Sequence, residues 1–133
     1  MKYLADSFFW IAHLNPRDAG PQRARQFTLN HPGARLYTTE DCLLEVLNHF
    51  SGFGPHTRLE AARFVRGLDG SHVRLLRRSP GEFDRAVHLC EQRPDKSYSL
   101  TDCLSMAVMR DLKLVAILSD DHHFTQEGFR LAL

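Results

Sequence analysis

Apolar residues along this chain recur at spacings that predict helices alternating with short strands. The clearest example is the segment 98–124. Apolar side chains follow each other at helical spacing over 100–112, and Met106 and Met109 make the opposite side of the same helix apolar. We therefore expect this helix to be buried nearly all round. The run 115–118 has the length and composition of a buried parallel strand, and polar residues begin directly after it.

The rest of the chain continues this alternation. Further strands are expected at 2–5, 35–38 and 73–76, with a last edge strand within 128–133. Further helices are expected at 7–14, 20–29, 40–50, 57–67 and 83–92, with turns at 15–18 and 68–71 among the connections. This order predicts an α/β fold, with helices flanking a central, mostly parallel sheet of four or five strands. The length fits one domain spanning 1–133.

Two of the predicted helices begin with recognisable capping residues. Thr38 or Thr39 is the expected N-cap of the third helix. Ser79 is the expected N-cap of the fifth helix, with Pro80 at its first position and Glu82 completing a capping box.

The composition excludes a membrane-spanning protein. Apolar residues make up 43% of the chain, and no apolar run approaches the roughly 20 residues that cross a bilayer. Asp6 interrupts the first apolar run too early for a secretory signal, so we expect a cytoplasmic protein. Cys42, Cys90 and Cys103 lack the spacing of zinc sites and are expected to be reduced core residues.

The net charge of +1 predicts no strong long-range attraction of the whole molecule for polyanions. Of the 17 basic residues, 14 are arginine, the side chain suited to bidentate phosphate contacts. They gather in two places, Arg17, Arg23 and Arg25, and then Arg74, Arg77 and Arg78. Both phosphate binding and ordinary surface charge are open interpretations of these groups.

Four acids stand out at the ends of strands or in the helices near them: Asp6, Glu45, Asp102 and Asp121. Taken singly, most have a simple structural explanation. Asp6 or Ser7 can cap the first helix, Asp120 can cap a short turn at 122, and Ser99 with Asp102 has the form of a capping box. On a helical wheel Glu45 lies opposite the apolar side of its helix and is expected to face solvent.

Taken together, the acids predict a metal site. The carboxyl ends of parallel strands share one edge of the sheet, and the first turns of the helices that follow the strands lie at the same edge, so Asp6, Asp102 and Asp121 are expected to converge. Two carboxylates ~4 Å apart repel by ~4 kcal/mol at an effective dielectric of about 20, so an ionised cluster needs a cation. Oxygen ligands select Mg²⁺ or Mn²⁺. Such ions suit hydrolysis of phosphodiesters by metal-activated water.

The chain also carries four short motifs in a characteristic order: Leu4-Ala5-Asp6-Ser7; Thr38-Thr39 with Leu43-Leu44-Glu45-Val46; Ser99-Leu100-Thr101-Asp102-Cys103-Leu104-Ser105; and Leu118-Ser119-Asp120-Asp121-His122-His123-Phe124 followed by Gly128-Phe129. In these motifs, over nearly its whole length, the chain resembles the PIN-domain ribonucleases of the VapC toxin type. The resemblance implies a three-layer PIN-like domain and a Mg²⁺- or Mn²⁺-dependent endoribonuclease that cleaves RNA. It also implies a homodimer and a type II toxin–antitoxin system, in which a small antitoxin protein blocks the cleft.

The resemblance also assigns residues. The family's four catalytic, metal-holding acids fall on Asp6, Glu45, Asp102 and Asp121. The polar positions that support those acids fall on Ser7, Thr39 and Ser119. Asp120 stands where the family commonly has an apolar or neutral residue, so either Asp120 or Asp121 could face the metal. Asp121 is favoured because it keeps the family's spacing to His123 and Phe124.

Two rival interpretations stay open. His122 and His123 beside two aspartates suggest a zinc site, although adjacent histidines do not readily point at one ion. A non-catalytic PIN-like module that binds protein or RNA is the alternative to a nuclease. In the nuclease interpretation, phosphate contacts are expected from Arg17, Arg23 or Arg78.

Overall fold

The computed structural model describes residues 1–14, 20–70 and 72–133. These residues form a five-stranded sheet with the order β3-β2-β1-β4-β5, in which every neighbouring pair is parallel. The strands are β1 Lys2–Ala5, β2 Arg35–Thr39, β3 Val73–Leu76, β4 Ala116–Leu118 and β5 Arg130–Leu131. The helices are α1 Ser7–Leu14, α2 Gly20–Asn30, α3 Glu40–His49, α4 Pro55–Leu68, α5 Glu82–Gln92, α6 Leu100–Asp111 and α7 His123–Gln126. The predicted parallel α/β sheet is confirmed.

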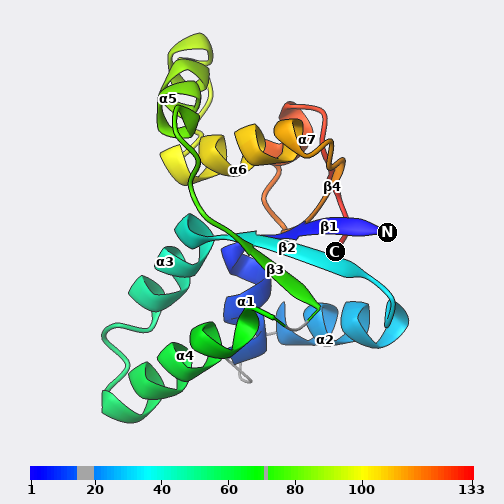
Figure 1. Ribbon diagram of the computed structural model, residues 1–133, viewed down its shortest axis with the longest axis vertical. Coiled ribbons are helices and arrows are strands. Elements are labelled where there is room, and N and C mark those ends of the chain that lie inside the picture. Colours follow the sequence, from blue (N-terminus) through cyan, green and yellow to red (C-terminus); the bar gives the residue numbers. More distant parts are fainter. Residues whose placement is uncertain (15–19, 71) are drawn as a thin grey trace.

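Helices cover both faces of the sheet and give three layers (Figure 1). The helices α1 to α4 lie on one side, α6 and α7 lie on the other, and α5 projects beyond α6. Each face buries its own apolar cluster, because successive side chains of a strand point to opposite faces. Ala5 packs with Phe9 and Trp10 on the α1 side, whereas Leu4 packs with Met106 on the α6 side.

The helix α6 is buried on most sides through its middle, as its apolar pattern predicts, and only Ala107 there is half-buried. Its buried residues are Cys103, Leu104, Ser105, Met106, Val108 and Met109. Since α6 lies between the sheet and α5, its exposed residues are at its end, Arg110 and Asp111, while its first turn is half-buried. The first turn of α6 is thereby held in a fixed place.

The central strands β1 and β4 end at the same edge of the sheet. Their register pairs Ala5 with Leu118, and the backbone N–H of Asp6 donates to the carbonyl of Leu118 at 3.3 Å. On the other side of β1, the Thr38 hydroxyl donates to the carbonyl of Ala5 at 2.9 Å and accepts from the Trp10 indole at 3.0 Å. The loops after β1 and β4 therefore start side by side.

The prediction that Ser79 is the N-cap of α5 is wrong. The N-cap is Gly81, which has a φ of +81° and makes no side-chain capping bond. Glycine takes this left-handed backbone at no steric cost. The Ser79 hydroxyl instead contacts the Glu82 carboxylate at 3.4 Å, while the Ser79 carbonyl accepts the Glu82 N–H at 3.2 Å. These two residues close the turn before the helix rather than capping it.

The other predicted boundaries are close to those observed. The helix α4 begins at Pro55, earlier than the expected 57, because proline is tolerated in the first turn of a helix. Val115 lies just outside β4 and is exposed. The turn predicted at 15–18, and Ser71 of the turn at 68–71, lie outside the described residues. Within the described part of the chain, no helix has the length and apolar character needed to cross a bilayer.

Candidate active site

A cleft of 610 Å³ opens at the edge where β1 and β4 end. All four predicted acids line it, and they come from four separate segments: Asp6 after β1, Glu45 in α3, Asp102 in α6 and Asp121 after β4. Because the loops after β1 and β4 start side by side, residues more than a hundred positions apart share one wall. The structure therefore brings together the acids that the sequence singled out.

Asp6 is the most buried of these acids, with 8% of its surface exposed. Its Oδ1 accepts from the backbone N–H of Ser7 at 2.9 Å and from the Cys42 thiol at 3.7 Å, and its Oδ2 accepts from the Ser119 hydroxyl at 2.8 Å. Burial raises the pKa of Asp6 to about 6, although the bonds from Ser119 and Ser7 lower it.

The charges of neighbouring acids contribute to the raised pKa of Asp6. Both Asp102 and Glu45 act in this direction, because each carboxylate disfavours a further negative charge nearby. Asp6, Glu45 and Asp102 are thus close enough to interact electrostatically, and a positive charge between them would relieve the repulsion of their carboxylates.

Glu45 is half-buried and faces the cleft, so the prediction that it faces solvent is wrong. Its Oε2 accepts from the Ser7 hydroxyl at 2.7 Å. The helical wheel misplaced it because apolar side chains of α3 do not all point inward: Leu44 and Leu47 are exposed, whereas Val46 is fully buried. The inner side of α3 therefore lies next to Glu45 rather than opposite it.

Asp102 combines a capping role with a place in the cleft. Its backbone N–H donates to the Ser99 hydroxyl at 3.0 Å, and its Oδ2 accepts from the Ser99 N–H at 3.1 Å, so the predicted capping box is confirmed. The same Oδ2 lies 3.2 Å from Nδ1 of His123. Capping and convergence on the cleft are therefore compatible.

Asp120 and Asp121 have different surroundings. Asp121 accepts from the N–H of His123 at 2.9 Å, and its own N–H donates to the Ser119 hydroxyl at 3.1 Å. Asp120 is about half exposed and lies 3.9 Å from the guanidinium of Arg23. The expectation that Asp120 caps the turn at 122 is wrong, since it is the Asp121 carboxylate that binds the first N–H of α7.

The two adjacent histidines point to different places. His123 lines the cleft, and its Nδ1 lies 3.2 Å from Asp102 and 3.3 Å from Asp121. His122 is exposed at the start of α7. The ligand atoms of Asp102, Asp121 and His123 all lie within 4.8 Å of one another, which would allow them to share one ion.

The predicted supporting residues divide into two kinds. Ser7 and Ser119 line the cleft and bind acids directly. Thr39 lies behind it as the N-cap of α3, where its hydroxyl accepts from the N–H of Cys42 at 3.0 Å. Burial and the nearby Asp6 raise the pKa of the Cys42 thiol to about 12, so the thiol keeps its proton and donates toward Asp6. Thr39 thus supports Asp6 only indirectly.

The cysteines agree in part with the expectation of a reduced core. All three are free; Cys42 and Cys103 are buried, whereas Cys90 is only half-buried. Cys90 and Cys103 join α5 to α6, with their sulfur atoms 3.0 Å apart.

The arginines expected to contact phosphate lie in different places. Arg23 stands at the mouth of the cleft, with its guanidinium 5.8 Å from the centre of the Phe8 ring. Arg78 binds Asp41, which lines a different hollow. Arg17 lies outside the described residues.

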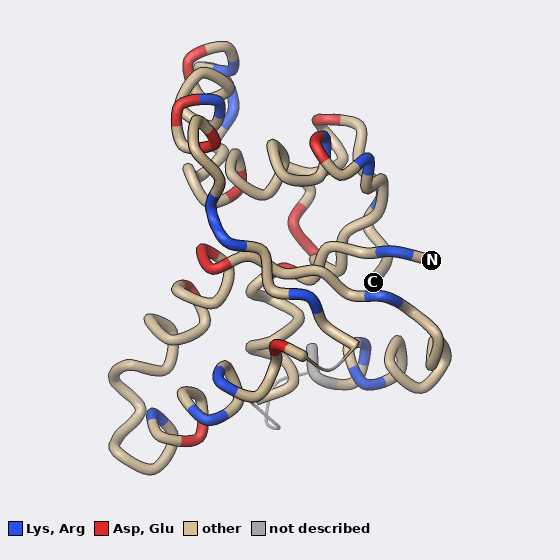
Figure 2. The backbone as a smooth tube through the Cα atoms, viewed as in Figure 1, with Lys and Arg blue, Asp and Glu red and all other residues tan. Residues whose placement is uncertain are grey.

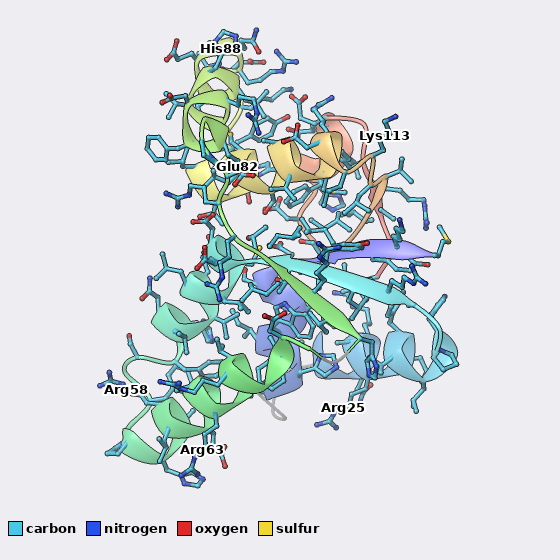
Figure 3. The ribbon with its side chains drawn as sticks, in the orientation of Figure 1. Arg25, Arg58, Arg63, Glu82, His88 and Lys113 are labelled. Carbon is cyan, nitrogen blue, oxygen red and sulfur yellow. The ribbon has the colours of Figure 1, made fainter. Side chains whose placement is uncertain are left out.

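Basic positions are spread over most elements of the described chain (Figure 2). The labelled Arg25, Arg58 and Arg63 point outward from α2 and α4 (Figure 3). Among the described residues, Arg23 is therefore the arginine best placed to reach a ligand in the cleft.

Sequence reasoning missed the part of the cleft wall that is not acidic. Phe8 and Ile11 of α1 form an apolar side, and His49 lies one helical turn beyond Glu45. The available signal for His49 was its spacing of four residues from Glu45, which places both on one side of a helix.

Fold and site together define an α/β domain with an acidic cleft at the carboxyl ends of its central strands. The sequence model of the PIN domain family matches residues 3–129, so the chain belongs to the PIN domain family. A comparison with curated proteins gives no significant match. Among solved structures, the chain is similar to that of Mycobacterium tuberculosis VapC20, described as a Sarcin-Ricin loop cleaving toxin. The TM-score is 0.84 and the sequence identity 23%, over 96% of this chain and 95% of that one.

Proposed function

We propose that this protein is a metal-dependent endoribonuclease of the VapC toxin type, which cleaves RNA phosphodiesters in the acidic cleft. The observation that carries the proposal is the meeting of Asp6, Glu45, Asp102 and Asp121, from four segments, in one cleft. Membership of the PIN family and the fold shared with a toxin that cleaves the Sarcin-Ricin loop support it.

The donor atoms of the cleft fit Mg²⁺ or Mn²⁺. Four carboxylates supply hard oxygen ligands. Burial is the main cause of the raised pKa of Asp6, and the negative charges of Asp102 and Glu45, which a divalent ion would neutralise, add to it. Asp6, Asp102 and Asp121, with Glu45, are the residues proposed to hold the ion. A bound ion of this kind activates water and stabilises charge on the phosphate.

The residues around the acids serve to position them and the substrate. Ser119 and Ser7 fix the carboxylates of Asp6 and Glu45 by hydrogen bonds. One of the four carboxylates helps to orient the attacking water. Arg23 can exchange its exposed partner Asp120 for a phosphate, because an ion pair open to solvent is weak.

The proposal extends to partners. A toxin of this type acts in the cytoplasm as a homodimer, and a small antitoxin protein inhibits it. The similarity of this fold to that of a VapC toxin supports an antitoxin partner and an RNA substrate. Expression of the chain alone should arrest growth, and co-expression of a short reading frame next to its gene should relieve the arrest.

Cleavage of RNA by the purified protein tests the proposal directly. Wild type should cleave with Mg²⁺ or Mn²⁺ and lose activity when the ion is chelated. Asp6→Asn and Asp102→Asn should abolish cleavage, whereas Asp84→Asn, at an exposed position of α5, should not. Retained cleavage in both cleft variants would defeat the assignment. A non-catalytic binding module would show no cleavage and no carboxylate-dependent uptake of metal.

A further inference from the structure

The position of His123 gives this cleft a nitrogen donor among its oxygens. Nδ1 of His123 lies 3.2 Å from Oδ2 of Asp102 and 3.3 Å from Oδ1 of Asp121. The two acids come from different elements, the first turn of α6 and the loop after β4. Nδ1 of His123 therefore lies at nearly equal distances from two carboxylates that come from separate segments of the chain.

A hydrogen bond accounts for only one of these contacts. Nδ1 carries at most one hydrogen, which can point well at a single oxygen. A divalent ion would account for both. Neighbouring ligand atoms around an octahedral ion with bonds of about 2.1 Å are separated by about 3 Å, close to the two distances observed. All three ligand atoms lie within 4.8 Å of one another, which is also the span expected around one ion.

The surroundings hold the imidazole in this orientation. The backbone N–H of His123 donates to Oδ1 of Asp121 at 2.9 Å, and the ring lies edge-on to Tyr98 with centroids 5.3 Å apart. Asp121 is fixed in turn by the Ser119 hydroxyl. A ligand held from both sides loses little freedom when it binds an ion.

We propose that His123 is a direct ligand of the ion held by Asp102 and Asp121, and that this mixed nitrogen and oxygen site prefers Mn²⁺ to Mg²⁺. The inference rests on the proposed metal-dependent function. Imidazole suits first-row transition ions, whereas Mg²⁺ is bound through oxygen ligands and retains water. The histidine thus selects the ion, a property that four carboxylates alone would not supply.

Pulsed electron paramagnetic resonance of the purified wild-type protein with Mn²⁺ tests the ligand directly. Coupling to a coordinated ¹⁴N should appear in the wild type, persist in His122→Ala, and disappear in His123→Ala and His123→Gln. His122 is the matched control because it is the adjacent histidine and is exposed. By calorimetry, the preference for Mn²⁺ over Mg²⁺ should fall about tenfold or more in both His123 variants and stay unchanged in His122→Ala.

The outcomes separate this inference from the proposed function. If Mn²⁺ binds in a manner that needs Asp102 but shows no ¹⁴N coupling, the histidine assignment is overturned while the nuclease proposal stands. The same holds if the ion preference is unchanged in His123→Gln. If the wild type takes up no ion in a manner dependent on Asp102, both are overturned. Absence of ¹⁴N coupling in the wild type overturns the assignment without any substitution. The two His123 variants, checked for folding by circular dichroism, distinguish His123 from His49, which also lines the cleft.

Discussion

The hydroxyl of Ser119 donates to Oδ2 of Asp6 at 2.8 Å, although the two residues lie 113 positions apart. The same hydroxyl accepts from the N–H of Asp121 at 3.1 Å. Ser119 is fully buried directly after β4, so one side chain joins the end of β1 to the loop that carries Asp121. Two acids of the cleft are therefore held by a residue that does not itself carry a charge.

Ser119→Ala should impair the cleft without unfolding the protein. Loss of the hydrogen bond removes an interaction that lowers the pKa of Asp6, so that pKa should rise above about 6. We expect metal affinity and cleavage to fall about 10- to 100-fold, the usual effect of removing a residue that orients a metal ligand. The pH profile of cleavage should move to higher pH.

Ser105→Ala is the matched control for this variant. Ser105 is also buried, but its hydroxyl contacts the Cys42 thiol at 3.6 Å instead of a carboxylate. Titration of Mn²⁺ and the pH dependence of the cleavage rate should therefore resemble the wild type. Equal effects of the two substitutions would mean that Ser119 acts only through packing.

The stability of the metal-free protein should depend on the ionisation of Asp6. Its pKa is raised from 3.8 to about 6 by folding, so the folded chain binds more protons than the unfolded chain between these values. Stability from this group is fully present below pH 4 and is lost as the pH rises through 6. The loss amounts to about 3 kcal/mol, an order-of-magnitude figure from the size of the change in pKa.

Asp6→Asn isolates this effect. In chelator, urea unfolding should find the variant and the wild type similarly stable near pH 4, and the variant more stable at pH 7 by up to about 3 kcal/mol. Added Mn²⁺ should stabilise the wild type at pH 7 and leave the variant nearly unchanged. A stability difference that does not vary with pH would contradict the electrostatic account of this acid.

Three of the four acids could be placed from the sequence, because one rule of parallel sheets governs them. Strands that run in one direction end at one edge, where Asp6 and Asp121 follow β1 and β4, and the first turn of α6, which carries Asp102, lies at the same edge. Glu45 could not be placed in this way. The exposure of Leu44 shows that α3 has apolar residues on its outer side, so a helical wheel gives the wrong inner face. The order of motifs within the family, rather than periodicity, pointed to Glu45.

The helix caps show a second limit of prediction from the sequence. Ser79, Pro80 and Glu82 have the spacing of a capping box, but the left-handed backbone of Gly81 starts the helix later. The role of Ser99 and Asp102 as a capping box was predicted correctly, whereas the contact of Asp102 with His123 depends on how α7 packs beside α6. The local sequence thus predicts the hydrogen bonds of the capping box, but the contact of Asp102 Oδ2 with His123 depends on tertiary packing.

Asp120→Asn and Asp121→Asn should have unequal effects on cleavage. Asp121 lies beside Asp102 and His123, so its loss of charge should lower the cleavage rate about 100-fold. The asparagine can still accept the N–H that begins α7, so the fold should be kept. Among the described residues, Asp120 pairs with the exposed Arg23, and its substitution should change the rate by no more than about threefold.

The RNA cleavage rates of the two variants, measured at equal metal concentration, decide which aspartate serves the site. Circular dichroism checks that both variants fold. A larger loss for Asp120→Asn would assign the fourth acid to the outer aspartate.

Glu127→Ala should destabilise the fold around α7. This carboxylate is 5% exposed and accepts from Nε of Arg93 at 2.7 Å, from Nη2 of Arg110 at 3.0 Å and from the Tyr98 hydroxyl at 3.1 Å. The arginines are 40% and 53% exposed and can turn to water when the acid is removed. We therefore expect a cost of about 1.5–3 kcal/mol, that of lost hydrogen bonds to a charged group, rather than that of a stranded buried charge.

The effect of Glu127→Ala should also reach the cleft. The Tyr98 ring that Glu127 holds lies edge-on to His123, so the variant should weaken Mn²⁺ binding as well as lower the midpoint of urea unfolding. Glu91→Ala, at an exposed position of α5, should change neither quantity. If Glu127→Ala lowers stability but leaves Mn²⁺ affinity intact, Tyr98 does not position the imidazole. If stability is also unchanged, the three hydrogen bonds to Glu127 are matched by water in the variant.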